Sequence, residues 1–128
     1  MRLLTPEVTS FIRASLRSVW SLELLLLIRG GGARQWTAEE LTRELRASRL
    51  LVNGILADFI KSGLVVQAAP ERFEYRAASP ALAELVDALA GIYAERPTAV
   101  IAAIVNAPRS NLESFADAFK FRNKPGGK

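Results

Sequence analysis

Two reactive residue types are missing from this chain of 128 residues, which contains no cysteine and no histidine. Without cysteine there is no disulfide framework, no thiolate metal site and no thiol-based redox switch. Without histidine the chain lacks the usual general base of enzymes and the most common nitrogen ligand of zinc. These absences remove most pairs of nucleophile and base, so we expect a protein that is not an enzyme and that holds no metal or cofactor.

Long apolar runs are also missing. The apolar stretches at residues 24–28 and 99–105 are far shorter than the ~20 residues that a membrane-spanning helix needs. Near its start the chain has a proline at position 6 and a glutamate at position 7, whereas a secretory signal has a basic start followed by an apolar segment. We therefore expect a cytoplasmic protein with no membrane partner.

The composition is that of one soluble domain, with 50% hydrophobic and 23% charged residues. The net charge of +4 suits a polyanionic partner, although many small basic proteins carry such a charge on an ordinary solvated surface. We expect a single domain over residues 1–128. It divides into a helical arm (1–17), a central unit (18–78), C-terminal helices that mediate dimerisation (79–119) and a flexible basic tail (120–128).

Capping residues and glycines predict where the helices begin and end. Thr5 followed by proline opens a helix in the arm, and a second helix runs from about 18 to 29, where three glycines stop it. Thr37 and Glu40 have the spacing of a capping box ahead of a short helix. Ser48 opens a longer helix to about residue 62, and Gly63 closes it.

The remaining elements are one hairpin and further helices. Residues 64–67 and 73–76 read as two short strands joined by a turn. Helices are expected from Ser79 to about 95 and from 98 to 106, with a proline at position 97 between them. A second capping box at Ser110 predicts a last short helix to about 119. On the 48–62 helix an apolar stripe faces the core, and it consists of Val52, Ile55, Leu56, Phe59 and Ile60.

The order of elements in residues 18–78 resembles a known DNA-binding fold. The similarity rests on residues 36–41, on the 48–60 helix, and on residues 62–65, where a glycine turns a helix directly into a strand. This pattern resembles the winged helix-turn-helix of bacterial transcription regulators of the MarR and ArsR kind, over about half of the chain. The predicted fold class is therefore mainly α, a winged helix-turn-helix with one β-hairpin wing and additional N- and C-terminal helices.

The resemblance implies a dimeric DNA-binding regulator of transcription in which the 48–62 helix enters the major groove and the 64–76 wing touches the neighbouring backbone. Arg46 and Arg49 lie at the N-terminus of this helix, where they suit phosphates, and Asn53 suits the edge of an adenine base. The predicted DNA-binding residues are Arg46, Ser48, Arg49, Leu50, Asn53, Lys61, Arg72 and Arg76.

The outward stripe of the 48–62 helix departs from that of a typical DNA reader, because Leu50, Gly54 and Ala57 accompany Asn53 and Lys61. A small, apolar stripe suits a second helix as well as a base pair, and Asp58 adds a negative charge nearby. The alternative function is a winged-helix protein-interaction module that acts on a transcription-related partner without binding DNA.

Apolar helices outside the central unit predict a homodimer, because a single unit of this size is not expected to cover them. The alternative is that these helices fold back over their own chain. The predicted dimer residues are Val8, Phe11, Ile12, Leu85, Leu89, Ile92, Val100, Ile101 and Ile104.

The sequence leaves a small-molecule effector undetermined. Four aromatic residues could line an apolar pocket at the dimer seam, although aromatic residues at helical spacing are more often core: Trp20, Trp36, Tyr93 and Phe115. The acidic residues Glu39, Glu40 and Glu44 are better interpreted as a capped and solvated helix face than as a metal site.

Overall fold

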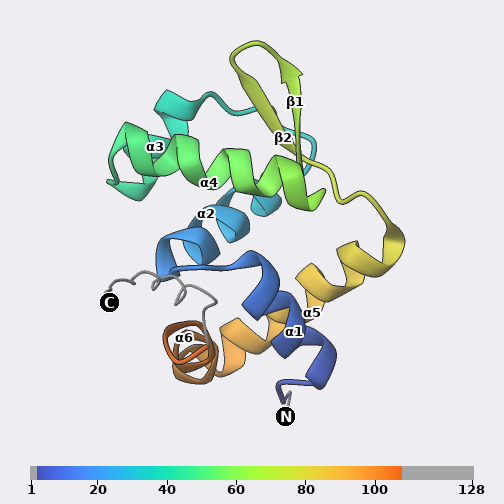
Figure 1. The fold of residues 1–128 in the computed structure, drawn as a ribbon. Helices are drawn as coiled ribbons and strands as arrows, with labels where there is room; N and C mark the ends of the chain where they lie inside the picture. Colours follow the sequence, from blue (N-terminus) through green and yellow to red (C-terminus); the bar gives the residue numbers. More distant parts are fainter. Residues whose placement is uncertain (1–2, 108–128) are drawn as a thin grey trace, which may run out of the picture.

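The computed structural model of the protein describes residues 3–107, of which 66% are helical. The expectation of a mainly helical chain with one small hairpin is confirmed (Figure 1). The elements in chain order are α1 (Pro6–Ser15), α2 (Val19–Gly30), α3 (Ala38–Leu45), α4 (Arg49–Ser62), β1 (Val65–Ala69), β2 (Arg72–Tyr75), α5 (Pro80–Glu95) and α6 (Pro97–Val105).

The helix starts lie where the capping residues predict them. The hydroxyls of the predicted caps Thr5, Ser48 and Ser79 each accept a hydrogen bond from a backbone N–H three residues further on. The hydroxyl of Ser18 does the same, although it was not predicted as a cap. The strands lie one or two residues from their predicted positions. The register of β1 shifts between Gln67 and Ala69, and this strand extends two residues further towards the turn than predicted. The predicted helix at 110–119 and the basic tail at 120–128 lie outside the described residues.

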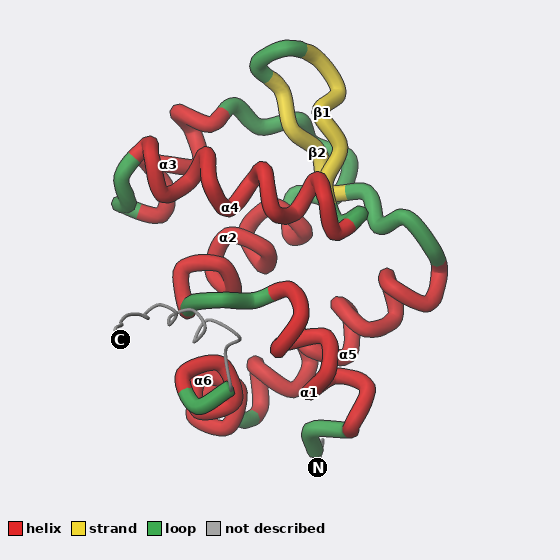
Figure 2. The backbone as a smooth tube through the Cα atoms, viewed as in Figure 1, coloured by secondary structure: helices red, strands yellow, loops and turns green. Residues whose placement is uncertain are grey.

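The helices form two groups around α2. Figures 1 and 2 show α3, α4 and the hairpin on one side of α2, with α1, α5 and α6 on the other. Buried side chains from all six helices and from β1 join in one hydrophobic cluster. Leu22, Leu24, Leu25 and Ile28 of α2 are fully buried, so this helix lies in the middle of the core.

A single residue pair ties the loop between α2 and α3 to the hairpin. Trp36 and Phe73 exchange two backbone hydrogen bonds of 2.7 Å, one in each direction, and form an antiparallel bridge beside β2. This bridge was not predicted, because one residue between two helices shows no alternation of apolar and polar positions. The bridge fixes the position of the hairpin against the start of α3.

The predicted dimer residues are mostly covered within one chain. Seven of the nine are buried, namely Val8, Phe11, Ile12, Leu89, Ile92, Val100 and Ile104, and the other two, Leu85 and Ile101, are half-buried. The reason is that α1, α5 and α6 pack against each other and against the central unit. The chain thus covers the apolar surface from which the homodimer was inferred, and the homodimer stays a prediction without that support.

Among residues 3–107 no single helix is long and apolar enough to cross a membrane. The helices α5 and α6 meet that test of length and composition only as a pair, and the chain bends by 117° between them.

The predicted capping box at the start of α3 is confirmed. Thr37 Oγ1 accepts a hydrogen bond of 3.0 Å from the backbone N–H of Glu40, and a Glu40 carboxylate oxygen accepts one of 2.9 Å from the backbone N–H of Thr37. That backbone hydrogen bond, with help from the charge of Arg34, lowers the pKa of Glu40 below its ordinary value. Because the folded-state pKa is the lower one, this stabilisation is present at neutral pH and is lost as the pH falls through the folded-state pKa.

Replacement of the capping threonine is expected to weaken α3. A Thr37→Ala variant leaves the Glu40 backbone N–H without its acceptor and should lower the free energy of unfolding by about 1 kcal/mol. Urea unfolding followed by circular dichroism measures this difference, and Thr37→Ser, which keeps the hydroxyl, is the control. Equal stability of the alanine and serine variants would show that the cap contributes nothing.

Candidate nucleic-acid interface

The turn between α3 and α4 has an unusual backbone. Arg46 ends α3 with φ 56° and ψ 40°, in the left-handed region, and its N–H donates to the carbonyls of Thr42 and Arg43. Within residues 3–107, Arg46 is the only residue other than glycine with a positive φ. Glycine would adopt this conformation at a lower cost in free energy, so the backbone is strained at Arg46.

The helix after this turn exposes the face that was predicted to point outward. Ser48 caps α4 by accepting a hydrogen bond of 3.1 Å from the backbone N–H of Leu51. The exposed residues of the outward stripe are Leu50, Asn53, Gly54, Ala57 and Lys61, and the buried residues of the inner stripe are Val52, Ile55, Leu56 and Phe59.

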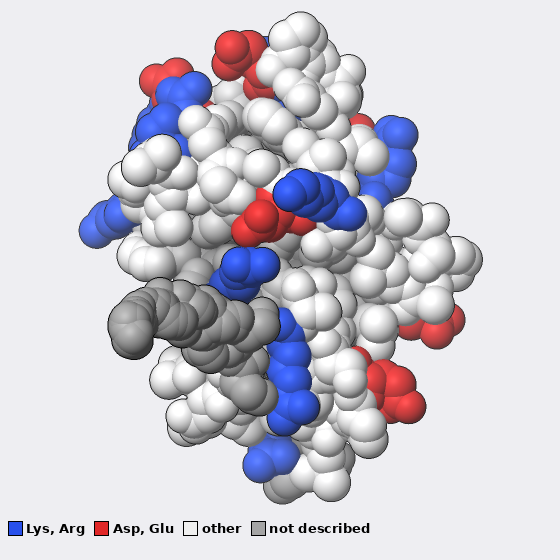
Figure 3. All heavy atoms as spheres, viewed as in Figure 1, with Lys and Arg blue, Asp and Glu red and all other residues white. Residues whose placement is uncertain are grey.

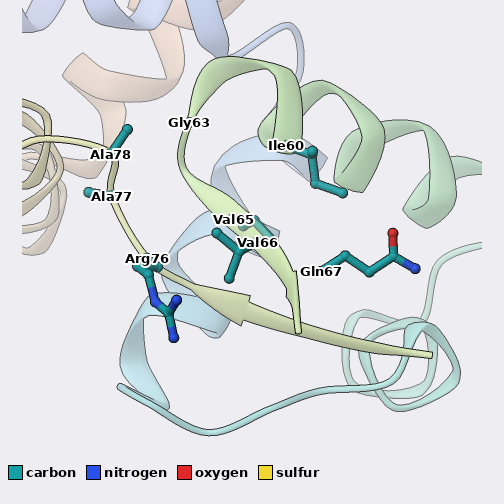
Figure 4. Close-up of a pocket in the computed structure, with 8 residues that line it drawn as sticks. All are labelled: Ile60, Gly63, Val65, Val66, Gln67, Arg76, Ala77 and Ala78. Atoms are coloured by element: carbon teal, nitrogen blue, oxygen red, sulfur yellow. The ribbon is translucent and has the colours of Figure 1, made fainter. Parts of the chain in front are cut away.

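The prediction that Ile60 belongs to the buried stripe is wrong, because its side chain is 40% exposed. It lies at the edge of the stripe and lines a hollow of about 420 Å³ between the end of α4 and the hairpin. Figure 4 shows Ile60 together with Val65 and Val66 beside this hollow, and Gln67 and Arg76 at its margins. The hairpin thus leaves one side of Ile60 open to solvent.

The described cations divide into paired and unpaired groups. The pairs and their N–O distances are Arg29 with Asp87 at 2.9 Å, Arg34 with Glu40 at 3.8 Å, Arg43 with Glu39 at 3.8 Å and Arg76 with Glu74 at 3.4 Å. In contrast, Arg46, Arg49 and Lys61 form no ion pair within residues 3–107, and all three are exposed. The cations without an internal counter-charge therefore include those on and beside α4.

The tertiary structure adds one cation that sequence analysis missed. Arg17, in the connection between α1 and α2, lines a hollow of about 370 Å³ together with Leu50, Gly54 and Asp58 of α4. Figure 3 shows this face as largely neutral, with basic groups spread over it and an acidic group beside a basic one near its centre. Arg17 lies more than 30 residues before the helix it joins, so no local pattern in the chain indicates this neighbourhood.

The predicted DNA-binding residues are only partly brought together. Five of them cluster at the first turns of α4, namely Arg46, Ser48, Arg49, Leu50 and Asn53. Lys61 lies near the other end of the helix, about 18 Å from Arg49 at the usual rise per residue. On the hairpin, Arg76 pairs with the nearly buried Glu74, and Arg72 is close enough to Glu40 to contribute to the lowering of its pKa.

The four aromatic residues considered for an effector pocket do not share one site. Trp36 is buried in the core, where the Arg34 guanidinium lies 3.6 Å from its ring centroid. Trp20 is at the surface, and Tyr93 donates a hydrogen bond to Glu23, one turn along α2 from Trp20. Phe115 lies outside the described residues.

Carboxylates form no metal-binding group within the described part of the chain. Two members of the predicted acidic cluster are engaged locally, since Glu39 pairs with Arg43 and Glu40 caps α3. The chain matches no protein-family model, and neither a curated protein nor a solved structure matches it significantly.

Proposed function

We propose that the chain is a winged-helix protein that binds duplex DNA through the outer face of α4 and regulates transcription as a dimer. The order α2, α3, turn, α4, hairpin supports this fold, as does the Trp36–Phe73 bridge that closes the unit. The observation that carries the proposal is the set of exposed cations without ion pairs around the start of α4, Arg17, Arg46 and Arg49. Such cations are available to phosphates without breaking an internal pair.

The proposal gives several residues at this end of α4 a role in binding. Arg46 and Arg49 lie at the helix N-terminus, where the backbone N–H groups and the helix dipole also favour a phosphate. Asn53 lies one turn further along on the outward stripe, at the position from which its amide can pair with an adenine edge. Gly54 has no side chain and faces open space, since a Cβ there would meet nothing within 4 Å, so a duplex can approach α4 closely at this position.

Fluorescence anisotropy tests DNA binding directly. The protein is titrated onto labelled duplexes from its own upstream region and onto a scrambled duplex, at about 50 and about 200 mM salt. Binding that prefers the upstream duplex and weakens steeply with salt is expected. Weak binding to both duplexes that disappears at the higher salt would contradict sequence-specific recognition.

One observation favours a second function, a protein-interaction module. Leu50 is 85% exposed in the first turn of α4, and it borders the hollow that also contains Gly54. An exposed leucine beside a side-chain-free helix position is a suitable anchor for a partner helix. The two functions use the same face, but they differ in whether Leu50 or the cations supply the binding energy.

A Leu50→Asp variant separates these two functions. If α4 binds a protein partner, the buried aspartate should weaken that complex by at least about tenfold, and added salt should matter little. If α4 binds DNA, the same variant weakens binding because its added negative charge repels the phosphates. Added salt should then narrow the difference in DNA affinity between the variant and the wild type. Pull-down and anisotropy experiments on the same preparations measure both effects. Ala57 is exposed on the same stripe, and Ala57→Ser, which adds no charge, is the control.

A further inference from the structure

A third hollow, which no residue of α4 lines, lies between the N-terminal half of α2 and the C-terminal end of α3. Its volume is about 410 Å³, and its lining residues are Val19, Trp20, Glu23, Glu44 and Leu45. This volume is in the range of small-molecule sites, which run from about 300 to about 1,000 Å³.

Trp20 leaves an aromatic surface open at this hollow. It is 42% exposed, and it is the only aromatic side chain among the large hydrophobic residues that are exposed within residues 3–107. Its neighbours Ser21 and Leu22 are buried, so the helix itself is firmly packed and holds the indole at the rim. The indole is the aromatic group that attracts a cation most strongly through its ring face.

Two carboxylates accompany the indole, one from each helix. Glu23 lies three residues after Trp20 and hence on the same face of α2, while Glu44 comes from α3. Neither carboxylate forms an ion pair within the described range 3–107, whereas Glu39, Glu40 and Glu74 do. Two uncompensated negative charges in one hollow stand out in a chain with a net charge of +4.

Glu23 is also held in position. The Tyr93 hydroxyl donates a hydrogen bond of 3.1 Å to Glu23 Oε2, which links α5 to the rim of the hollow. Burial raises the pKa of Tyr93, and the hydrogen bond to Glu23 and the charge of that carboxylate raise it further. The phenol therefore remains a donor at neutral pH, and one oxygen of Glu23 is fixed while the other can receive a ligand.

From this combination we propose that the hollow binds a small organic cation, a protonated amine or quaternary ammonium that carries an apolar body. Val19 and Leu45 supply apolar contacts for the body, the Trp20 indole supplies an aromatic face for the cation, and Glu23 and Glu44 supply opposite charge. The proposal does not depend on DNA binding, because the hollow uses none of the residues assigned to the α4 face.

The two indole N–H groups allow a direct test, since the chain contains only two tryptophans. In ¹H–¹⁵N NMR spectra of the full chain, Trp20→Phe assigns the Trp20 signal by its disappearance. Benzyltrimethylammonium is the probe, and benzyl alcohol is the uncharged control. We expect a saturable shift of the Trp20 signal with a Kd of about 1 mM or tighter, with the buried Trp36 signal unmoved. A Trp20 signal that does not move, or that moves equally with benzyl alcohol, would overturn the proposal.

Charge removal separates cation recognition from general hydrophobic binding. Glu23→Gln with Glu44→Gln should weaken the binding of the probe by at least about fivefold. Glu71→Gln with Glu84→Gln also removes two exposed carboxylates, both outside the hollow; it is the matched control and should leave the binding unchanged. An unchanged Trp36 signal in each variant verifies the fold. Equal affinity in the double variant and the wild type would mean that the carboxylates do not recognise the cation, and the proposal would fail.

Discussion

Arg49→Glu is expected to weaken the binding of duplex DNA by at least about tenfold at low salt, because it replaces the proposed phosphate contact with a repulsive charge. Arg49 is exposed, has no ion pair within residues 3–107, and lies at the first position of α4. A glutamate there also suits the helix dipole, so the variant should fold at least as well as the wild type. The loss would therefore report on binding and not on stability.

The matched control is Arg96→Glu, at the junction of α5 and α6, which Figure 1 shows at the far end of the molecule from the hairpin. Each variant replaces one positive charge by one negative charge, so each lowers the net charge by two, from +4 to +2. Anisotropy against the same duplex should show that the Arg49 variant has lost affinity while the control has not. Equal losses would mean that net charge alone attracts DNA and that α4 is not the contact face.

The slope of binding against salt gives a second measure of the same contact. Arg49→Ala should reduce the dependence of log affinity on log salt by about one, as expected for one lost phosphate. Arg17→Ala should do the same if the hollow that it shares with α4 lies against the backbone of the duplex. An unchanged slope for Arg17 would restrict the interface to the residues of α4 and the turn before it.

Gly63→Ala is expected to cause the largest loss of stability among single small substitutions, about 3 kcal/mol. Gly63 ends α4 with φ 79°, in the left-handed region, and its N–H donates to the carbonyls of Phe59 and Ile60. A Cβ at this position would lie 2.9 Å from the Cβ of Ala78, so the chain after the hairpin must move. Its carbonyl also accepts a hydrogen bond of 2.8 Å from Ala78 N–H, so this movement would disturb the junction with α5.

Two other glycines separate the cost of the backbone conformation at Gly63 from the cost of the close contact with Ala78. Gly32 also has a positive φ, of 61°, but a Cβ there meets nothing within 4 Å, so Gly32→Ala should cost only the backbone term of about 1 kcal/mol. Gly54 lies inside α4 with open space around it, and Gly54→Ala should stabilise the chain by about 0.5–1 kcal/mol. Urea unfolding of the three variants measures the series. If Gly63→Ala cost no more than Gly32→Ala, the close contact with Ala78 would not constrain the fold.

Local chemistry accounts for what the sequence predicted well. A cap acts over three residues, as at Thr37, and a glycine ends a helix through its own backbone, as at Gly63, so both features are visible without knowledge of the rest of the chain. The same holds for the outward stripe of α4, since helical periodicity assigns Asn53 and Lys61 to one side. The exposed edge at Ile60 escaped this reasoning, because the hairpin determines how much of that edge is covered.

The sequence by itself determined the helix boundaries, the position of the hairpin and the exposed face of α4, because each follows from interactions between residues a few positions apart. The tertiary structure alone decided that α1, α5 and α6 cover each other within one chain, that Arg17 joins α4, and that Trp20 and Glu44 share a hollow. These neighbours are far apart along the chain, and the way in which helices pack depends on the shapes of all the side chains between them. Periodicity identifies an apolar face, but only packing shows which surface covers it.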